Sequence, residues 1–547
     1  MTDEKDPKDE EKKSEAVTAP DEGEAKAEES EKSEKSEEPK AAAKAEEKKP
    51  EEKKPEKSDK PKAKKKEKDA ADAYRLAPSN PVSGAWKSFA GMGLVGVVGS
   101  AIGYSQDHSR FAYAWLFGFI CTLTIAIGAM MFVIMHHLAS GSWGIVVRRV
   151  AEVLGQASWV LILLILPVVA LRGEVFHEWL HDDTKVQKEE PKEHAALDLP
   201  QDPRDLELAA NDLQPHGFPP HGFPPHPGGG RHFQPRQPNP HPAGGVHGTP
   251  VHMHFGNDVE ARADKIEHDE VMASKTWFLN QPFFFIRLII YLAALYLIGF
   301  TLFKWSTDQD KSKDPLMVVK LRKFAAGGAV LLSLTLTFAA FDWIMTLDPT
   351  WYSTIFGVTF FASSMVCIFA LLILVFLGMR QSGVLVKEVT VEHYHDLGKL
   401  LFGFMCFWAY VNFSQFMLIW YAAIPEEVTF FHHRWDVGPW KTISLAIVLL
   451  HFMFPFVFIM SRNIKRNLTL LKVGATLLLT MHVIDMYWLV LPNAPHQTTF
   501  APSWIDVFGF MGPVGIFLAV AFRKLLDNPI VPVGDPRLER SIHFLNA

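Results

Sequence analysis

Ten long apolar stretches constrain this chain more than any other feature of its sequence. A helix needs about 20 apolar residues to cross a hydrocarbon core of about 30 Å. In lipid every backbone N–H and C=O group must find a partner within the protein, which a helix provides within one segment. The sequence therefore predicts an all-α polytopic membrane protein with ten transmembrane helices, at about residues 88–104, 111–135, 150–171, 282–303, 324–341, 354–378, 400–420, 442–460, 473–491 and 504–522. The first stretch is rich in glycine, which favours close packing against another helix.

Charged residues are concentrated at the start of the chain. Among residues 1–70, 44 are Lys, Asp or Glu, and no aromatic residue occurs there. Such a segment cannot bury enough apolar surface to offset the entropy of ordering it, which predicts a disordered tail over residues 1–85. The remaining 477 residues hold 35 Lys and Arg and 37 Asp and Glu, about 15% charged, against about 25% in soluble domains.

Loop charges predict the orientation of the spans. The short connections on the N-terminal side, together with the C-terminal tail, contain 19 Lys and Arg residues. The opposite short loops contain three, namely Arg110, Arg434 and Lys441. The excess of positive charge predicts that both termini are cytoplasmic. Arg434 follows His432 and His433 in an outer loop, where we expect all three side chains to be solvated.

The spans and tails divide the chain into five parts. They are a cytoplasmic tail over 1–85, helices one to three in 86–172, a periplasmic loop over 173–280, helices four to ten in 281–523, and a cytoplasmic C-terminal tail over 524–547. The long loop holds 12 of the 23 His residues in a Pro- and Gly-rich context. An exposed, partner-facing loop is the favoured interpretation, and transition-metal binding by the His-rich tract is the alternative.

Cysteine usage excludes several cofactors that are held covalently or by thiolates. The chain has three Cys and contains neither C-x-x-C-H nor C-x-x-C. This excludes c-type haem attachment, a four-cysteine iron–sulfur site and a disulfide framework. No Gly-rich nucleotide motif follows a strand-like run either.

Polar residues inside the spans are the candidate functional residues, since such groups are costly in lipid and usually face the interior of a helical bundle. A rise of 1.5 Å per residue orders them by depth, from the N-terminal side of the membrane to the opposite side. Read in that order, they form a discontinuous series of candidates for a proton path, namely His136, His137, Lys399, His451, His482, Asn412, Gln415, Asp485, Asp342 and Asp348.

Three interpretations of this series remain open. Carboxylates, imidazoles and amides can pass protons or serve quinol chemistry through short hydrogen-bonded steps. His451 and His482 lie at similar predicted depths, so they could instead ligate a b-type haem. The third interpretation is structural, with polar groups that simply hydrogen-bond across helices. His482 and Asp485 are three residues apart and share a helix face, as an acid/base pair would.

Two longer stretches are more specific than hydropathy. One runs from Phe341-Asp342-Trp343 through Asp348-Pro349-Thr350-Trp351-Tyr352 to Gly357, and the other from Asp396-Leu397-Gly398-Lys399 through Phe407-Trp408 to Pro425-Glu426-Glu427. With His136-His137, Trp143 and Arg148-Arg149, they resemble the smaller NrfD-like membrane subunits of alternative complex III, called ActF. The resemblance covers about residues 86–530, the His-rich loop excepted.

The resemblance implies an architecture and a set of partners. It implies two four-helix bundles, from spans two to five and six to nine, with one peripheral helix at each end. It implies a bacterial inner-membrane complex in which a sibling NrfD-like subunit, an iron–sulfur subunit and multihaem cytochrome c subunits carry the redox cofactors. It leaves open whether this chain binds quinone. It also implies that this chain holds no haem. Membrane lipid and the quinol pool are further expected partners, and nucleic acid is not.

The expected function is therefore that of a membrane subunit in a respiratory quinol:cytochrome c, or other periplasmic acceptor, oxidoreductase. Its role would be proton conduction or association with the quinone site, without a redox cofactor or an assigned catalytic residue. An independent secondary transporter is one alternative, and it would show internal repeats and broken helices. A purely structural membrane anchor is the other.

Overall fold

The structure is a computed structural model that describes residues 72–177, 179–180, 271–422, 425–435, 438–494 and 502–546. Residues 1–71 of the predicted disordered tail lie outside these residues, and so does most of the His-rich loop. Residues 72–85 differ from the prediction, since they include the helix Pro81–Gly84 and the Asn80 side chain donates to the Ser382 carbonyl at 2.9 Å. The interpretation of that loop as a metal-binding or partner-facing segment therefore stays a prediction.

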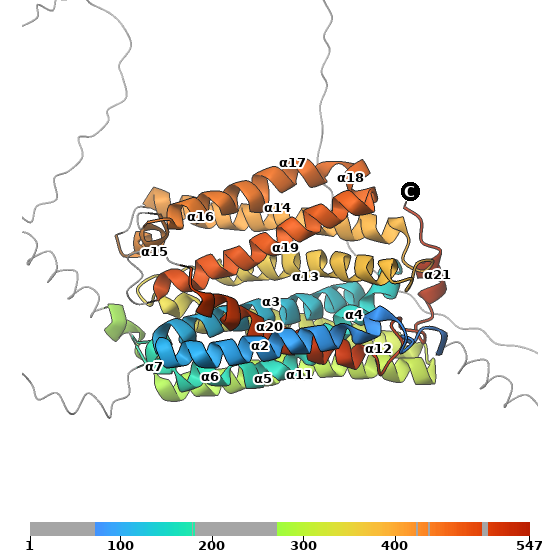
Figure 1. Cartoon of the computed structure of the whole chain (residues 1–547), viewed down its shortest axis with the longest axis horizontal. Coiled ribbons are helices and arrows are strands. Elements are labelled where there is room, and N and C mark those ends of the chain that lie inside the picture. The colour runs from blue at the N-terminus through green and yellow to red at the C-terminus, as the bar shows by residue number, and fades with distance from the viewer. Residues whose placement is uncertain are drawn as a thin grey trace, which may run out of the picture. The chain divides into compact units, whose positions relative to one another are not determined.

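Within the described residues the chain forms helices and no strands, and ten helical segments are long and apolar enough to cross a membrane (Figure 1). This confirms the predicted all-α polytopic membrane protein. The spans are Ala85–Gln106 (α2), His108–Ala139 (α3), Ile145–Ala170 (α4 to α6), Gln281–Ser312 (α11), Leu316–Trp343 (α12), Phe356–Gln381 (α13), Val391–Ala422 (α14), Trp440–Met460 (α16, η4 and α17), Leu468–Val490 (α19) and Trp504–Leu525 (α20). Shorter described helices include Arg172–Val175 (α7), Pro425–Trp435 (α15), Arg462–Arg466 (α18) and Leu538–Ile542 (α21).

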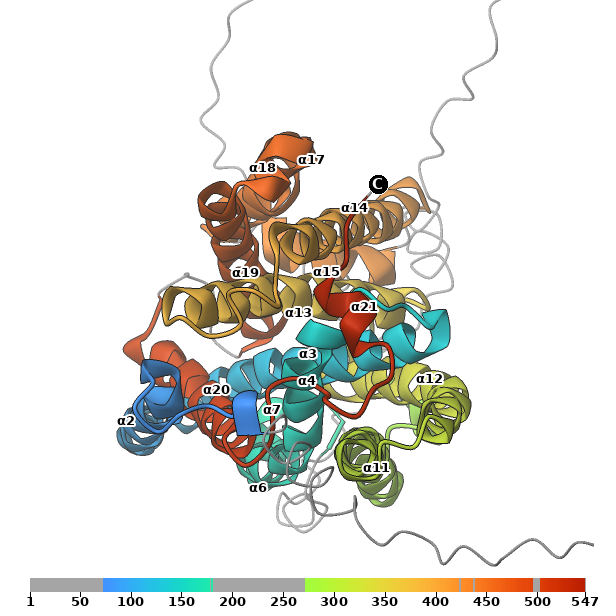
Figure 2. The same cartoon turned by 90° about the vertical axis from the view of Figure 1, so that its right-hand side faces the viewer.

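The helices form two four-helix bundles. Helices α3, α4, α11 and α12 pack in a closed ring, and α13, α14, the eighth span and α19 form the second ring. The two bundles meet where α3 packs against α13 (Figure 2). The apolar stretch of α3 is buried over its whole length inside the protein. The two-bundle arrangement that the resemblance implied is therefore present.

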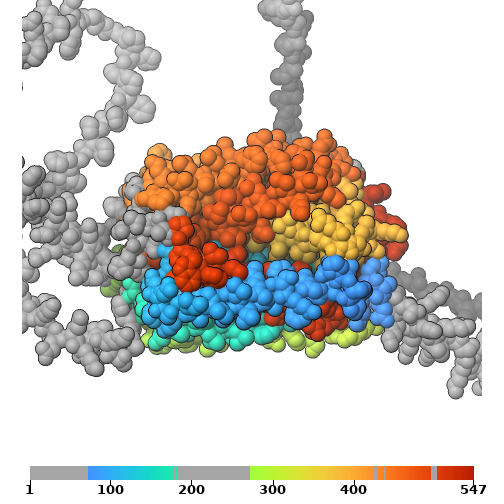
Figure 3. Space-filling view, viewed as in Figure 1, coloured from blue at the N-terminus to red at the C-terminus, as the bar shows by residue number. Residues whose placement is uncertain are grey.

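The two peripheral helices differ from that expectation, because they pack against each other instead of standing at opposite ends. Helix α2 lies along α20, and α20 packs against α3 (Figures 2 and 3). Glycine explains the contact. A Cβ atom on Gly96 would collide with the backbone of Gly512, and one on Gly93 would collide with the backbone at Ile516. Missing side chains let two backbones approach closely, as the glycine-rich sequence predicted.

We expect Gly96→Val to lower the free energy of unfolding by about 1–3 kcal/mol, because the branched side chain has no space against α20. Gly91→Val is the matched control, since a Cβ on Gly91 meets no atom within 4 Å. Thermal unfolding in detergent measures both variants. Equal midpoints for the two would contradict the close α2–α20 contact.

One span contains a segment of π-helix. Residues Ile447–Met453 (η4) are wound as a π-helix, and Pro455 follows them. Proline has no N–H group, so it cannot donate to the carbonyl four residues earlier, which belongs to His451. The wider turn is a response to this missing hydrogen bond, and such turns often occur at functional sites.

The chain brings both described termini to one end of the helices, where α2 begins and α21 lies (Figure 1). We call it the basic end, because most loop Lys and Arg residues belong to it, and the other end the opposite end. The segment after α20 crosses the basic end: Ile530 N–H donates to the Tyr74 carbonyl at 2.9 Å, and Gly534 touches Gln309 at the end of α11. Whether this end is cytoplasmic stays a prediction.

Candidate functional site

A buried polar cluster lies at the seam between the two bundles. His482 on α19 shares a hydrogen bond of 3.0 Å between Nε2 and the Thr124 hydroxyl on α3. One turn further, the Asp485 carboxylate accepts from the Trp408 indole N–H at 3.2 Å and from the Ser363 hydroxyl at 3.3 Å. All five side chains are buried. We call this group, together with His451, the seam cluster.

His451 completes the seam cluster from the π-helical segment. Its ring lies against the Trp408 indole, with ring centroids 4.1 Å apart. The side chain is fully buried, and neither ring nitrogen has a hydrogen-bond partner among the described residues. The Nδ1 atom of His482 likewise has no such partner. The cluster thus combines a carboxylate, two imidazoles and unused hydrogen-bonding capacity in an interior that normally satisfies its polar groups.

Polar groups continue from the seam cluster toward the opposite end. On α14, Asn412 donates to the Trp408 carbonyl at 3.0 Å, and Gln415 accepts from the Ser353 hydroxyl at 3.0 Å. Beyond them Asp348 accepts from the Thr350 hydroxyl at 2.8 Å, while its other carboxylate oxygen is buried without a partner among the described residues. Three of the predicted candidates therefore lie on the same side of the cluster.

Toward the basic end, by contrast, the seam cluster is followed by apolar residues. Residues 125–135 of α3, between Thr124 and His136, are all apolar, which separates the two polar positions by about 18 Å along the helix. His136 and His137 are both buried, and none of their ring nitrogens has a hydrogen-bond partner among the described residues. The predicted series is thus interrupted between these histidines and the seam cluster.

Asp342 lies in the first bundle, away from the seam cluster, and has a cationic partner. Arg287 of α11 donates to its two carboxylate oxygens at 2.7 and 2.9 Å, and the Tyr291 hydroxyl donates at 2.8 Å. The Arg287 guanidinium also lies 3.9 Å from the centroid of the Phe278 ring. This bidentate pair is buried, so it holds α11 against α12 with both charges compensated.

We expect Asp342→Asn to lower the free energy of unfolding by about 3–5 kcal/mol, since it leaves the charge of Arg287 buried without a counter-charge. The double variant Arg287→Met with Asp342→Leu should recover most of that loss, because it removes both charges together. Thermal unfolding of the two variants is the measurement. A double variant less stable than the single one would show that the pair is not coupled in this way.

Lys399 lies at the basic end and is half-exposed. Its ammonium group is 2.5 Å from the Asp396 carboxylate one turn earlier and 3.2 Å from the Asn546 side-chain oxygen. Helix α14 begins at Val391, before the predicted start of the seventh span at about residue 400, so Lys399 lies inside the helix. Nothing described joins Lys399 to the seam cluster by hydrogen bonds.

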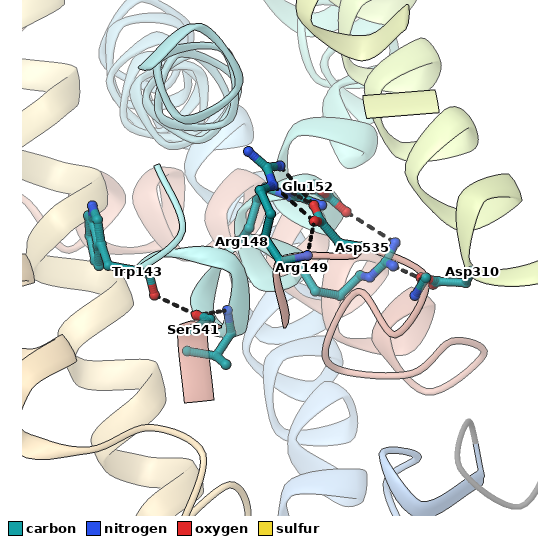
Figure 4. A network of polar contacts seen from close by, with 10 residues as sticks. Trp143, Arg148, Arg149, Glu152, Asp310, Asp535 and Ser541 are labelled. Atoms are coloured by element: carbon teal, nitrogen blue, oxygen red, sulfur yellow. Dashed lines mark hydrogen bonds and ion pairs between the residues drawn. The ribbon is translucent and has the colours of Figure 1, made fainter. Parts of the chain in front are cut away.

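A buried ion-pair network occupies the basic end of the first bundle (Figure 4). Arg148 donates to Glu152 at 2.6 Å and to Asp535 at 3.0 Å, and Arg149 pairs with Glu152 at 3.0 Å and with Asp310. Ser541 on α21 donates to the Trp143 carbonyl at 2.7 Å (Figure 4). Although the sequence assigned both arginines to a loop, they are fully buried in the first turns of α4.

Asp535 links the C-terminal segment to this network. Burial would raise the pKa of its carboxyl group, but hydrogen bonds from Arg537 and the charge of Arg148 outweigh burial. The pKa in the folded protein therefore lies well below its ordinary value. Because the folded-state pKa is lowered, the pair contributes its full stability above the unfolded-state pKa and loses it as the pH falls through the folded-state pKa.

We expect Asp535→Asn to destabilise the protein by about 3 kcal/mol at neutral pH, because Arg148 loses a buried counter-charge. The difference from the parent should stay constant down to about pH 4 and shrink below it. Asp527→Asn, which changes a half-exposed carboxylate, serves as the control. Thermal midpoints measured across a pH series test both statements, and a pH-independent difference would contradict the second.

The expectation that Arg434 is solvated is wrong. Its side chain is buried and donates to the carbonyls of Phe430, Trp488 and Leu489 at 2.8, 3.2 and 3.0 Å. The neighbouring His432 and His433 are exposed, as predicted. A guanidinium has five N–H groups, so it can satisfy several carbonyls at helix ends that lack intrahelical donors.

Arg110, the second arginine of the outer loops, is buried as well. It pairs with Asp506, which also accepts from the Tyr487 hydroxyl at 3.0 Å. Asp506 closes a capping box with Ser503 at the start of α20. Two of the three cations that the sequence placed in the short outer loops therefore hold helices together from inside the protein.

The two candidate haem ligands, His451 and His482, each contact another side chain. His482 directs Nε2 to Thr124, and the Trp408 indole covers the ring of His451. The haem interpretation stays an untested prediction, which a visible spectrum of the purified chain decides.

No model of a known protein family matches this chain, and no curated protein is similar to it in sequence. The residues that sequence reasoning missed are the partners of the candidates, above all Arg287, Ser363 and Thr124. Arg287 had a detectable signal, since it is an ionisable residue six positions into the α11 helix. Ser363 and Thr124 had none, because small hydroxyl residues are common in membrane helices.

Proposed function

We propose that this integral membrane protein is a subunit of a quinol:acceptor oxidoreductase of the alternative complex III type, and that its seam cluster exchanges protons. The ten apolar helices support the membrane assignment. The complex and its partners rest on the sequence resemblance, and the two four-helix bundles are compatible with it. The proton role rests on the geometry of one carboxylate.

That carboxylate belongs to Asp485, which is buried without a cation. Among the described buried carboxylates inside the ten spans, the others lie within ion-pair distance of an arginine or lysine. Asp485 instead accepts long hydrogen bonds from the neutral groups of Trp408 and Ser363. An unpaired buried charge is costly, so a proton is the partner available to balance it.

The neighbours of Asp485 suit proton exchange. His482 lies on the same helix face three residues earlier, and its Nδ1 atom has no partner among the described residues. Imidazole can donate through one nitrogen and accept through the other, which lets it relay protons. Asn412, Gln415 and Asp348 then continue toward the opposite end, whereas apolar residues follow toward the basic end. The arrangement therefore favours proton exchange with the opposite side of the membrane.

We expect Asp485→Asn to slow quinol-driven proton movement by about tenfold or more without loss of the assembled complex, because the amide cannot carry the proton. The measurement is proton release and quinol turnover by the complex in its native membranes or in vesicles. Asp308→Asn makes the same chemical change at the basic end, outside the seam cluster, and should leave both rates unchanged. Unaltered turnover and proton stoichiometry in Asp485→Asn would remove the carboxylate from any proton path.

Co-purification tests the complex independently of the proton role. Gentle extraction of the full-length chain should yield a species that co-elutes with haem and iron–sulfur proteins. A chain that elutes alone would instead favour the transporter, and the proton role of Asp485 could then still be tested with an imposed pH gradient.

A further inference from the structure

An open groove of about 520 Å³ lies at the basic end, where α11 ends and α12 begins. It is separate from the seam cluster and from the buried ion-pair network. Its walls combine aromatic, aliphatic and cationic side chains, from Trp305, Leu316, Val319, Lys320, Lys323 and Phe324.

The aromatic floor of the groove positions one of its cations. The ring of Trp305 meets that of Phe324 edge-on, with ring centroids 5.2 Å apart. The ammonium group of Lys320 lies 4.1 Å from the centroid of the Trp305 ring. A cation over an indole face is attracted by the ring and keeps donors available for another ligand. Lys320 is therefore held at the groove with N–H groups to offer.

The groove carries positive charge that the described residues do not balance. Neither Lys320 nor Lys323 forms an ion pair within the described part of the chain. The nearby carboxylates have other partners: Asp308 lies 3.8 Å from Lys311, Asp310 pairs with Arg149, and Asp314 accepts from the Leu316 N–H at 2.9 Å. An anion entering the groove would thus meet two ammonium groups that have no ion-pair partner among the described residues.

Further along α12, away from the basic end, the helix face that carries the two lysines is apolar. Positions 320, 323, 327, 330 and 334 follow helical spacing and share one face. Gly327 has open space where a side chain would stand, and Val330 and Leu334 are 62% and 54% exposed. The surface therefore offers charge at the end of the span and a smooth apolar strip along it, as an anionic lipid requires.

We propose that this groove binds an anionic phospholipid. Its phosphate would sit between Lys320 and Lys323, and an acyl chain would lie past Gly327 along Val330 and Leu334. Clusters of basic residues between transmembrane helices recognise anionic headgroups, and tryptophan favours the interfacial depth at which such headgroups lie. The groove faces outward from α11 and α12, so the lipid would form part of the first bundle's boundary.

Native mass spectrometry of the full-length protein, titrated with dioleoyl phosphatidylglycerol or dioleoyl phosphatidylcholine, tests the proposal. We expect tight binding of phosphatidylglycerol that the double variant Lys320→Gln/Lys323→Gln weakens about 30-fold, since each lysine near an anionic lipid contributes about fivefold. Lys323→Gln alone leaves the Lys320–Trp305 contact in place and should weaken binding about fivefold. Phosphatidylcholine binding should not change.

The matched control is Lys387→Gln/Lys472→Gln, which removes the same charge from two exposed positions near the basic end and outside the groove. It should bind phosphatidylglycerol like the parent. An equal loss in both double variants would reduce the effect to general surface charge and overturn the proposal, as would no loss in either. Inorganic phosphate should not displace the lipid. Complete displacement would identify a site for a soluble anion instead.

Discussion

Lipid offers no water to a charged side chain, so a charge that a helix carries into the bundle is stabilised chiefly by a counter-charge on another part of the protein. Arg287 finds Asp342 on the next span, and Arg110 finds Asp506 nearly 400 residues later in the chain. Arg148 reaches Asp535 in the C-terminal segment. Each pair satisfies two buried charges at once, and each thereby fixes how two distant segments meet.

Against this background the environment of Asp485 is unusual. Neutral donors surround it, and histidines with unused ring nitrogens lie close by on α19 and on the π-helical segment. A structural carboxylate would gain from a cation, as the other described buried carboxylates inside the ten spans do. The missing cation, the hydroxyl and indole donors, and the polar residues that continue toward one end together favour a group whose charge changes during function.

Two outward-facing regions, one on the peripheral helices and one on the first bundle, illustrate how the protein meets its surroundings. Glycines let α20 cover one face of α2 at backbone contact, which leaves the rest of α2 exposed. At the α11–α12 turn, lysines stand over an aromatic floor, and an apolar strip continues along the span. The α2–α20 contact excludes lipid because the two backbones fit closely together. The groove at the α11–α12 turn is suited to an anionic lipid because of its lysines.

The sequence by itself determined the ten spans, the glycine contact of the first span and the shared face of His482 and Asp485, because hydropathy and helical spacing are local properties. It also located Asp342 and Asp348 correctly at the end of the fifth span. The tertiary structure alone decided that Asp342 is neutralised by Arg287, that Arg434 is buried and that apolar residues separate His136 from the seam cluster. The partner of a buried charge depends on which helices pack together, and that follows from the summed contacts of the whole chain, which no short stretch of sequence records.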